Sequence, residues 1–502
     1  MRTTAARTAS LEWIGAALFI AVAAIYCFSA PTADPDLWGH VHFGRAMLES
    51  GSLPATNEYS YTAPDHPWVN HEILAECIFA AAYDRFGSPG LLLLKLGAGL
   101  VTLSLMARAS ATRTSAPLVW AGALFVCASL MAWGYLIRPQ IFSFLGLAIV
   151  WERILTYEGR RVLRSLLPLP LVIAVWVNTH GGVLAGLGVL LVYVAVRVWS
   201  VDSPTERLGL FALAALCIAA IFANPYGIVL PRFLLQDVAH ARPISEWLPI
   251  PLFDGSAALF KSTVVLAGVG AVLFRRNRWW EAVIVGLAAV AAFRHQRHLP
   301  LFAILVAPLL TETLDACWRS VREPLGLGAP SPLRTALFSI GLAALAIFEV
   351  VQIARIYEGL HFQILASPDQ FPVDAVRFIK RNELRGNLAV PFDWGEYAIW
   401  HLYPRCRVSI DGRYTTAYPQ AVLDSSARFS SGAPGWDEFL RAADVVLLDR
   451  RQPIVARLLE QPAWQDVYSD QTALVFVRKA EASRVSLVRE WRSTPEGAFF
   501  FP

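Results

Sequence analysis

Two acidic residues and a histidine lie close together near the start of the chain, where they could exchange a proton or hold a metal ion. Asp34, Asp36 and His40 directly follow the first long apolar run. If a helix begins near Asp36, that carboxylate and the imidazole four residues later share one face. Such a pair could bind a divalent cation or relay a proton. The alternative is that Asp36 only caps the helix and His40 faces a wet interface.

The elements that position these side chains are mostly apolar. Of 502 residues, 56% are hydrophobic and only 16% are charged, whereas soluble domains carry about 25% charge. The excess apolar side chains must therefore face lipid. The six cysteines show no CxxC spacing, which indicates neither a zinc site nor a disulfide framework. The net charge of +4, with scattered arginines, argues against nucleic-acid binding.

About eleven runs are long and apolar enough to cross a bilayer. They are predicted at residues 11–29, 90–107, 116–134, 139–156, 165–178, 181–198, 208–223, 258–274, 279–293, 298–313 and 334–356. The first run is read as a retained span rather than a cleaved signal peptide, because further spans follow it. Residues 71–86 contain several charges and predict an amphipathic helix at the interface.

The loop arginines predict the orientation. With the N-terminus inside, alternate loops contain most of them, as cytoplasmic connections should. The polar clusters then all lie at the outer rim, whereas a transporter is expected to hold ionisable sites near the bilayer midplane. These clusters lie at residues 34–42, 66–72, 138–140, 178–182, 224–226, 246–247 and 294–298.

The composition becomes that of a globular domain from about His361 onward. Helical patterns at 372–381 and 394–402 alternate with strand-like runs at 387–392, 407–410, 445–448 and 473–477. The predicted fold is a mainly α polytopic membrane protein with a C-terminal α/β domain outside the cytoplasm. The expected domains are a transmembrane domain at 1–360, with a large first outer loop at 30–89, and a soluble domain at 361–502.

This layout resembles that of the GT-C glycosyltransferases, which include protein O-mannosyltransferases, aminoarabinose transferases and oligosaccharyltransferases. Three motifs carry the resemblance: Asp36-Leu37-Trp38, Trp394-Gly395-Glu396-Tyr397 and Ile410-Asp411-Gly412-Arg413. They look most like bacterial members of unassigned substrate whose chain ends in an α/β domain. The chain lacks the acidic residue that mannosyltransferases carry directly after the position of Asp36.

The resemblance implies an enzyme of the bacterial-type cytoplasmic (inner) membrane that moves a sugar from a polyprenyl-phosphate-linked donor to a glycan, lipid or protein acceptor outside. Asp36, with Asp34 and His40, would supply the base or a metal ligand. Outer-side cations would bind the donor phosphate, although headgroup contact is the alternative. These cations are Arg138, Arg294, Arg297 and Lys95.

Two further sets of residues complete the predicted site. A divalent metal ion is the expected cofactor, and His71, Glu72 and His180 would complete its site. Asp411 and Arg413 could contact the acceptor, although a strand-end Asp-Gly-Arg is also typical of a turn with an ion pair.

Two other classes of protein stay open from the sequence. One is a transporter or flippase of lipid-linked glycans with an accessory outer domain. The other is a catalytically silent scaffold that displays the α/β domain. The chain contains no GxGxxG motif after a strand, which disfavours a nucleotide-sugar donor bound in a Rossmann-like domain.

Overall fold

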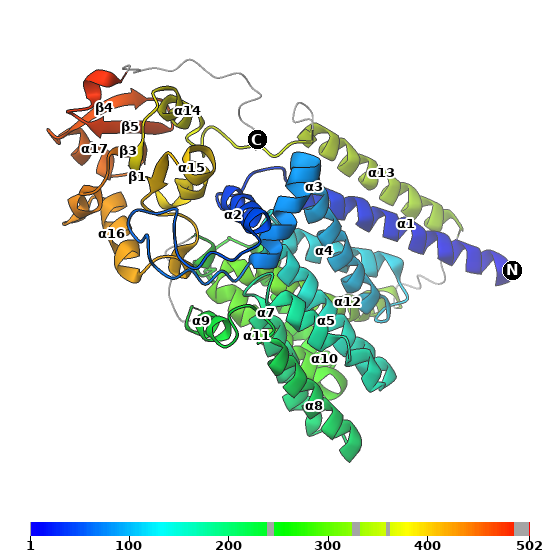
Figure 1. Ribbon diagram of the computed structural model, residues 1–502. Helices are drawn as coiled ribbons and strands as arrows, with labels where there is room; N and C mark the ends of the chain where they lie inside the picture. Colours follow the sequence, from blue (N-terminus) through cyan, green and yellow to red (C-terminus); the bar gives the residue numbers. More distant parts are fainter. Residues whose placement is uncertain (1, 238–244, 324–331, 358–361, 486–500, 502) are drawn as a thin grey trace. The chain divides into compact units, whose positions relative to one another are not determined.

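A computed structural model describes residues 2–237, 245–323, 332–357, 362–485 and 501. The chain divides into two compact units. The helical unit comprises residues 1–30 and 93–361, and the mixed unit comprises residues 31–92 and 362–502. The two units are described separately below (Figure 1).

Helices account for each of the eleven predicted spans. Only 165–178 is divided, into a 3-10 turn and a short helix that begins after Pro168, because proline donates no backbone hydrogen bond. Including short helices that were not predicted, the elements are α1 (Arg2–Phe28), α3 (Ile73–Ala111), α4 (Pro117–Ala132), α5 (Gln140–Arg160), η1 (Leu163–Leu166), α6 (Leu169–Trp176), α7 (Val183–Val198), α8 (Pro204–Ala220), α9 (Val229–Asp237), η2 (Ser245–Trp247), α10 (Ala258–Leu273), α11 (Arg275–Arg294), η3 (Gln296–His298), α12 (Leu299–Arg322) and α13 (Pro332–Tyr357).

The surface of these helices fits a lipid environment. Three helical segments in the described residues are long and apolar enough to cross a membrane, namely Leu11–Phe28, Ile73–Ala111 and Gln296–Arg322, and four shorter helices are also apolar. Large apolar side chains stay exposed, such as Leu171 and Val265 at 69% and 66%. The predicted polytopic α-helical fold is confirmed.

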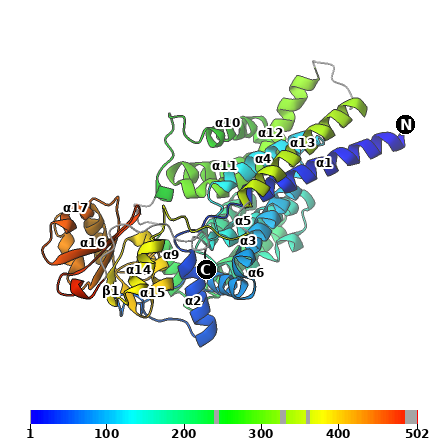
Figure 2. The same cartoon turned by 90° about the horizontal axis from the view of Figure 1, so that it is seen from above.

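Packing within the helical unit centres on α12. It contacts α4, α5, α10 and α11, and most of its first half is buried. α1 and α13 lie side by side in both views, although they come from opposite ends of the unit's sequence (Figures 1 and 2).

α3 combines the predicted interfacial helix and the second predicted span. Gly87 interrupts its helical backbone with φ 63° and ψ −154°, a conformation that residues with a side chain rarely adopt. Pro89 begins the next turn. The division between the units falls within this helix, after Leu92.

The mixed unit contains a five-stranded sheet in the order β2-β1-β3-β5-β4. β1 runs parallel to β2 and β3, whereas β5 is antiparallel to β3 and β4. The predicted strands and helices are all present, and α16, α17 and β4 are additional. The elements are α14 (Val373–Arg381), β1 (Gly386–Ala389), α15 (Gly395–Leu402), β2 (Cys406–Val408), α16 (Gln420–Ser431), β3 (Val445–Asp449), α17 (Ile454–Leu459), β4 (Trp464–Ser469) and β5 (Ala473–Arg478).

The first loop is part of this mixed unit. Its helix α2 (Leu37–Ser50) packs on α15. Ser60 forms a parallel bridge with Val408 beside β2, and Asn57 Nδ2 donates to the carbonyl of Ala417 at 3.1 Å. The loop predicted at 30–89 and the domain predicted from residue 361 therefore share one core.

Candidate functional site

Asp36 precedes α2 but does not cap it through its side chain. Its carboxylate forms no capping hydrogen bond with the helix. The buried Asp34 accepts a hydrogen bond from the backbone N–H of Asp36 at 3.0 Å and so fixes the entry to the helix. The Asp36 carboxylate is directed at Gly412, where an added Cβ would collide with its Oδ1. This geometry disfavours the capping role that the sequence left open.

Glu396 lies beside Asp36, although the sequence did not predict it as a site residue. It belongs to α15 and is 3% exposed. Its carboxylate fills the space that side chains at Gly39 and Gly412 would need, and Oε1 would lie 2.9 Å from a Cβ on Gly412. Within the described residues, its buried Oε2 has no hydrogen-bond partner. Burial, and then the charges of Asp36 and Asp411, raise the pKa of Glu396 well above its usual range, which favours the neutral acid.

Asp411 and Arg413 form a buried ion pair that joins the first loop to the C-terminal part of the unit. Asp411 Oδ2 accepts from Arg413 Nη2 at 2.6 Å and from the Tyr418 hydroxyl at 2.5 Å. Arg413 Nη2 also donates to Asn57 Oδ1 at 2.6 Å. The guanidinium stacks over the ring of Trp68 at 4.5 Å. Burial opposes its charge, but Asp411 raises the pKa of Arg413 above its ordinary value.

His40 meets two carboxylates across the first loop. Its Nδ1 lies 3.5 Å from Glu76 Oε1 and 3.8 Å from Glu72 Oε2. Burial lowers the pKa of His40, but Glu76 and Glu72 outweigh that effect and raise it to about 9. The sequence analysis named His40 and Glu72 and missed Glu76. The signal for Glu76 was its spacing, because it lies one helical turn after Glu72.

The other members of the predicted metal set have different surroundings. His71 Nε2 lies 3.5 Å from Glu72 Oε1, so it contacts this cluster at its edge. His180 belongs to the helical unit. Its Nδ1 accepts from the backbone N–H of Gly182 at 3.0 Å and lies 2.7 Å from Ser143 Oγ.

The predicted phosphate-binding cations all belong to the helical unit. Arg138 Nη1 forms an ion pair with Glu246 Oε1 at 2.6 Å. The guanidinium of Arg297 lies 4.8 Å from the ring of Trp247, the next residue after Glu246. Arg138 and Arg297 therefore contact adjacent residues of η2.

The remaining two cations differ in exposure. Arg294, at the end of α11, is exposed. Lys95 is 1% exposed, and its Nζ donates to the carbonyl of Ala30 at 2.6 Å. This contact ties α3 to the chain that leaves α1. Of the two, Arg294 is the more accessible to a phosphate.

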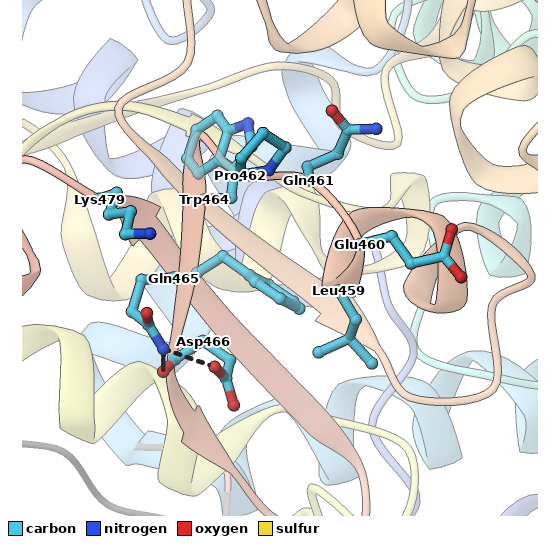
Figure 3. A pocket seen from close by; sticks show the side chains of 9 residues that line it. Leu459, Glu460, Gln461, Pro462, Trp464, Gln465, Asp466 and Lys479 are labelled. Carbon is cyan, nitrogen blue, oxygen red and sulfur yellow. Dashed lines mark hydrogen bonds between the residues drawn. The ribbon is translucent and has the colours of Figure 1, made fainter.

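A pocket of about 270 Å³ opens on the mixed unit between α17 and the strands β4 and β5 (Figure 3). Gln465 donates a hydrogen bond to the Asp466 carboxylate at its wall. None of the predicted site residues lines this pocket. The buried acidic cluster around Asp36 has the groups that proton transfer needs, so we take that cluster as the candidate site.

No protein-family model matches the chain, and no curated protein is detectably similar in sequence. Solved structures do match its fold. The oligosaccharyltransferase of Archaeoglobus fulgidus in the apo form aligns with a TM-score of 0.53 and 12% identity over 88% of this chain and 69% of that one. The same enzyme with zinc and sulfate gives 0.50 and 10%, over 93% and 73%.

The apo structure of ArnT from Cupriavidus metallidurans aligns with a TM-score of 0.52 and 14% identity over 94% of this chain and 98% of that one. These proteins are GT-C glycosyltransferases. The chain is thus a polytopic membrane protein with the GT-C fold, and the fold expected from the sequence motifs is confirmed.

Proposed function

We propose that this protein is an integral membrane glycosyltransferase that moves a sugar from a polyprenyl-phosphate-linked donor to an acceptor at the outer membrane face. One observation carries the proposal. In a chain with the GT-C fold, Asp36 leaves its helix uncapped and directs its carboxylate to the buried Glu396 at Gly412. The acceptor is a glycan, a lipid or a protein.

Asp36 acts as the base in this reaction. An acceptor hydroxyl or amine attacks the anomeric carbon, the bond from that carbon to the phosphate oxygen breaks, and its electron pair leaves with the phosphate. The acceptor proton passes to Asp36. Because Glu396 is kept neutral by its buried position beside Asp36, Asp36 holds the negative charge of the pair. A positioned base contributes about a hundredfold to ten-thousandfold in rate.

Cations of the helical unit bind the departing phosphate. Arg294 and Arg297 offer planar guanidinium groups that bind phosphate oxygens in pairs. Arg138 joins them by exchanging its partner Glu246 for the phosphate, and Lys95 contributes charge. The sulfate in the Archaeoglobus structure belongs to that protein, but an oxyanion there supports the search for an anion site here.

A divalent metal ion is the cofactor we propose, as the zinc in the Archaeoglobus structure supports. His40, Glu72 and Glu76 have a donor set that fits such an ion. Bound there, it would supply positive charge near the acidic cluster. Asp411 and Arg413 fix the first loop, and acceptor contact by them stays a prediction.

The test uses the purified full chain in detergent with synthetic polyprenyl-phosphate-linked hexose, N-acetylhexosamine and aminoarabinose as donors. Release of polyprenyl phosphate is measured in the presence of membrane extract as acceptor. Asp36→Asn keeps the shape and removes the base, so we expect a loss of about a hundredfold to ten-thousandfold. The control is Asp65→Asn, an exposed residue of the same loop.

An Asp36→Asn protein with the wild-type rate would overturn the assignment of the base. If the wild-type chain in sealed vesicles moves a labelled lipid-linked sugar across the bilayer and transfers none of it, the protein is a flippase. Asn caps a helix about as well as Asp, so a capping role alone predicts no loss.

A further inference from the structure

Three metal-ligating side chains converge where α2 crosses the start of α3. The ligand atoms of His40, Glu72 and Glu76 all lie within 4.8 Å of one another. Glu72 directly precedes α3 and Glu76 lies in its first turn, so their spacing brings both carboxylates to one side of the helix. All three residues belong to the mixed unit.

The distances are close to those that an ion would impose. Ligand atoms bound to zinc at about 2.1 Å in a tetrahedral site lie about 3.4 Å apart. His40 Nδ1 lies 3.5 Å from Glu76 Oε1 and 3.8 Å from Glu72 Oε2. Side-chain shifts of a few tenths of an ångström would therefore be enough for these two contacts, and the backbone need not move.

Neighbouring polar groups hold the two carboxylates in place. Asn70 Nδ2 donates to Glu76 Oε2 at 2.6 Å, and Asn70 Oδ1 accepts from the Glu72 backbone N–H at 2.9 Å. His71 Nε2 lies 3.5 Å from the outer oxygen of Glu72. Metal ligands are commonly oriented by a second layer of hydrogen bonds of this kind.

Burial increases the need for a positive charge at this point. Glu76 is 3% exposed and His40 is 7% exposed. Two carboxylates that share a buried space repel each other unless a cation lies between them. Either a metal ion or a protonated His40 would meet this requirement, and the two differ in what they bind.

We propose that His40, Glu72 and Glu76 form a divalent metal site with one nitrogen and two oxygen ligands. This donor set suits Zn²⁺ or Mn²⁺. Three protein ligands leave at least one coordination position open, as in catalytic zinc sites. The site needs neither Asp36 nor His180, and it stands or falls independently of the proposed sugar transfer.

The experiment measures metal binding directly. The full chain is purified in detergent without an affinity tag, treated with EDTA and titrated with ZnCl₂ or MnCl₂ by calorimetry, and bound metal is quantified by mass spectrometry. We expect one ion per chain. Loss of one ligand should weaken binding at least as much as loss of an outer-layer partner does, about tenfold to a hundredfold. The variants are His40→Ala, Glu72→Gln and Glu76→Gln.

Matched controls come from the same loop and helix. His66→Ala removes a partly exposed histidine of the first loop, and Glu49→Gln removes an exposed carboxylate of α2. Both should bind metal as the wild type does. The proposal is overturned if the wild type binds no stoichiometric ion, or if binding survives in the ligand variants.

Folding of the variants does not decide the outcome. Glu72 is the most exposed of the three ligands, with a side chain 16% exposed, and Glu72→Gln keeps its size. If the two variants of buried residues fail to fold, unchanged affinity in Glu72→Gln overturns the proposal and weakened affinity supports it. Sugar transfer is not measured, so an inactive protein that binds one ion supports the site and counts only against the proposed function.

Discussion

The two carboxylates beside Gly412 depend on the absence of a side chain there. A Cβ at residue 412 would collide with Asp36 Oδ1 and would lie 2.9 Å from Glu396 Oε1. Because Glu396 is packed between Gly39 and Gly412, neither carboxylate can yield without disturbing the other. The glycine therefore holds the geometry of the pair.

Gly412→Ala should displace Asp36 and slow sugar transfer by about a hundredfold, the effect of a misplacement of about 1 Å at a reacting group. Overpacking should also lower the free energy of unfolding by about 1 to 3 kcal/mol. Transfer rate and thermal unfolding are measured together. Gly188→Ala is the control, because a Cβ there meets open space. A Gly412→Ala protein with normal turnover would show that the pair has no role in the reaction.

Arg294 and Arg297 test the phosphate assignment at the same scale. Alanine at either position should weaken donor use, because a charge-assisted contact contributes about 1.5 to 3 kcal/mol, or about a tenfold to hundredfold change. Lysine should restore only part of it, because it lacks the planar fork. The Michaelis constant for the donor is the measurement, with Arg160→Ala as the control. Wild-type values in both alanine variants would make these residues ordinary interface cations.

Among the elements, α2 carries most of the site. It brings Asp36 to Glu396 at its first residue and His40 to Glu72 and Glu76 one turn later. The next histidine, His42, lies among aromatic rings, 5.4 Å from Tyr59 and 6.1 Å from Tyr403. Burial, and then the charges of Arg45 and Arg413, lower the pKa of His42 to about 4.

This low pKa predicts that α2 loses stability in acid. Between pH 6.5 and 4 the unfolded chain binds a proton at His42 and the folded chain does not, so the free energy of unfolding falls as the pH falls. From pH 7 to 5 the loss should be about 2 kcal/mol. His42→Gln should show a smaller decrease in melting temperature over this range. Equal decreases in both proteins would contradict the assignment of a neutral His42.

At the scale of the whole molecule, the first loop and the C-terminal domain must lie on one side of the membrane. The bridge from Ser60 to Val408 and the hydrogen bond from Asn57 to Ala417 join them directly. A membrane between the two segments would break these contacts. The loop arginines predict that this side is the outer one.

Cysteine labelling in intact cells tests the predicted orientation. Thr56→Cys and Arg405→Cys are both exposed positions and should both react with a membrane-impermeant reagent. Arg160→Cys, in a predicted cytoplasmic loop, should react only after the cells are opened. The exposed Cys317 is replaced by serine in all three proteins. Labels at residues 56 and 405 on opposite sides would contradict the shared core.

The sequence by itself determined the helical spans and most elements of the C-terminal domain. Apolar runs and alternating patterns are local properties, and they located the spans and every predicted strand. β4 escaped prediction because Gln465 and Asp466 interrupt its apolar pattern. The motif around Asp36 was also visible, since its residues are adjacent in the chain.

Only the tertiary structure decided which residues meet. Glu396 lies 360 residues after Asp36 in the chain, and its role depends on α15 packing against α2. Glu76 replaces His180 beside His40 and Glu72 because α3 begins where α2 passes. Spacing in a sequence predicts neighbours within one element. Contacts between distant segments depend on how buried faces fit together, and no local pattern specifies that fit.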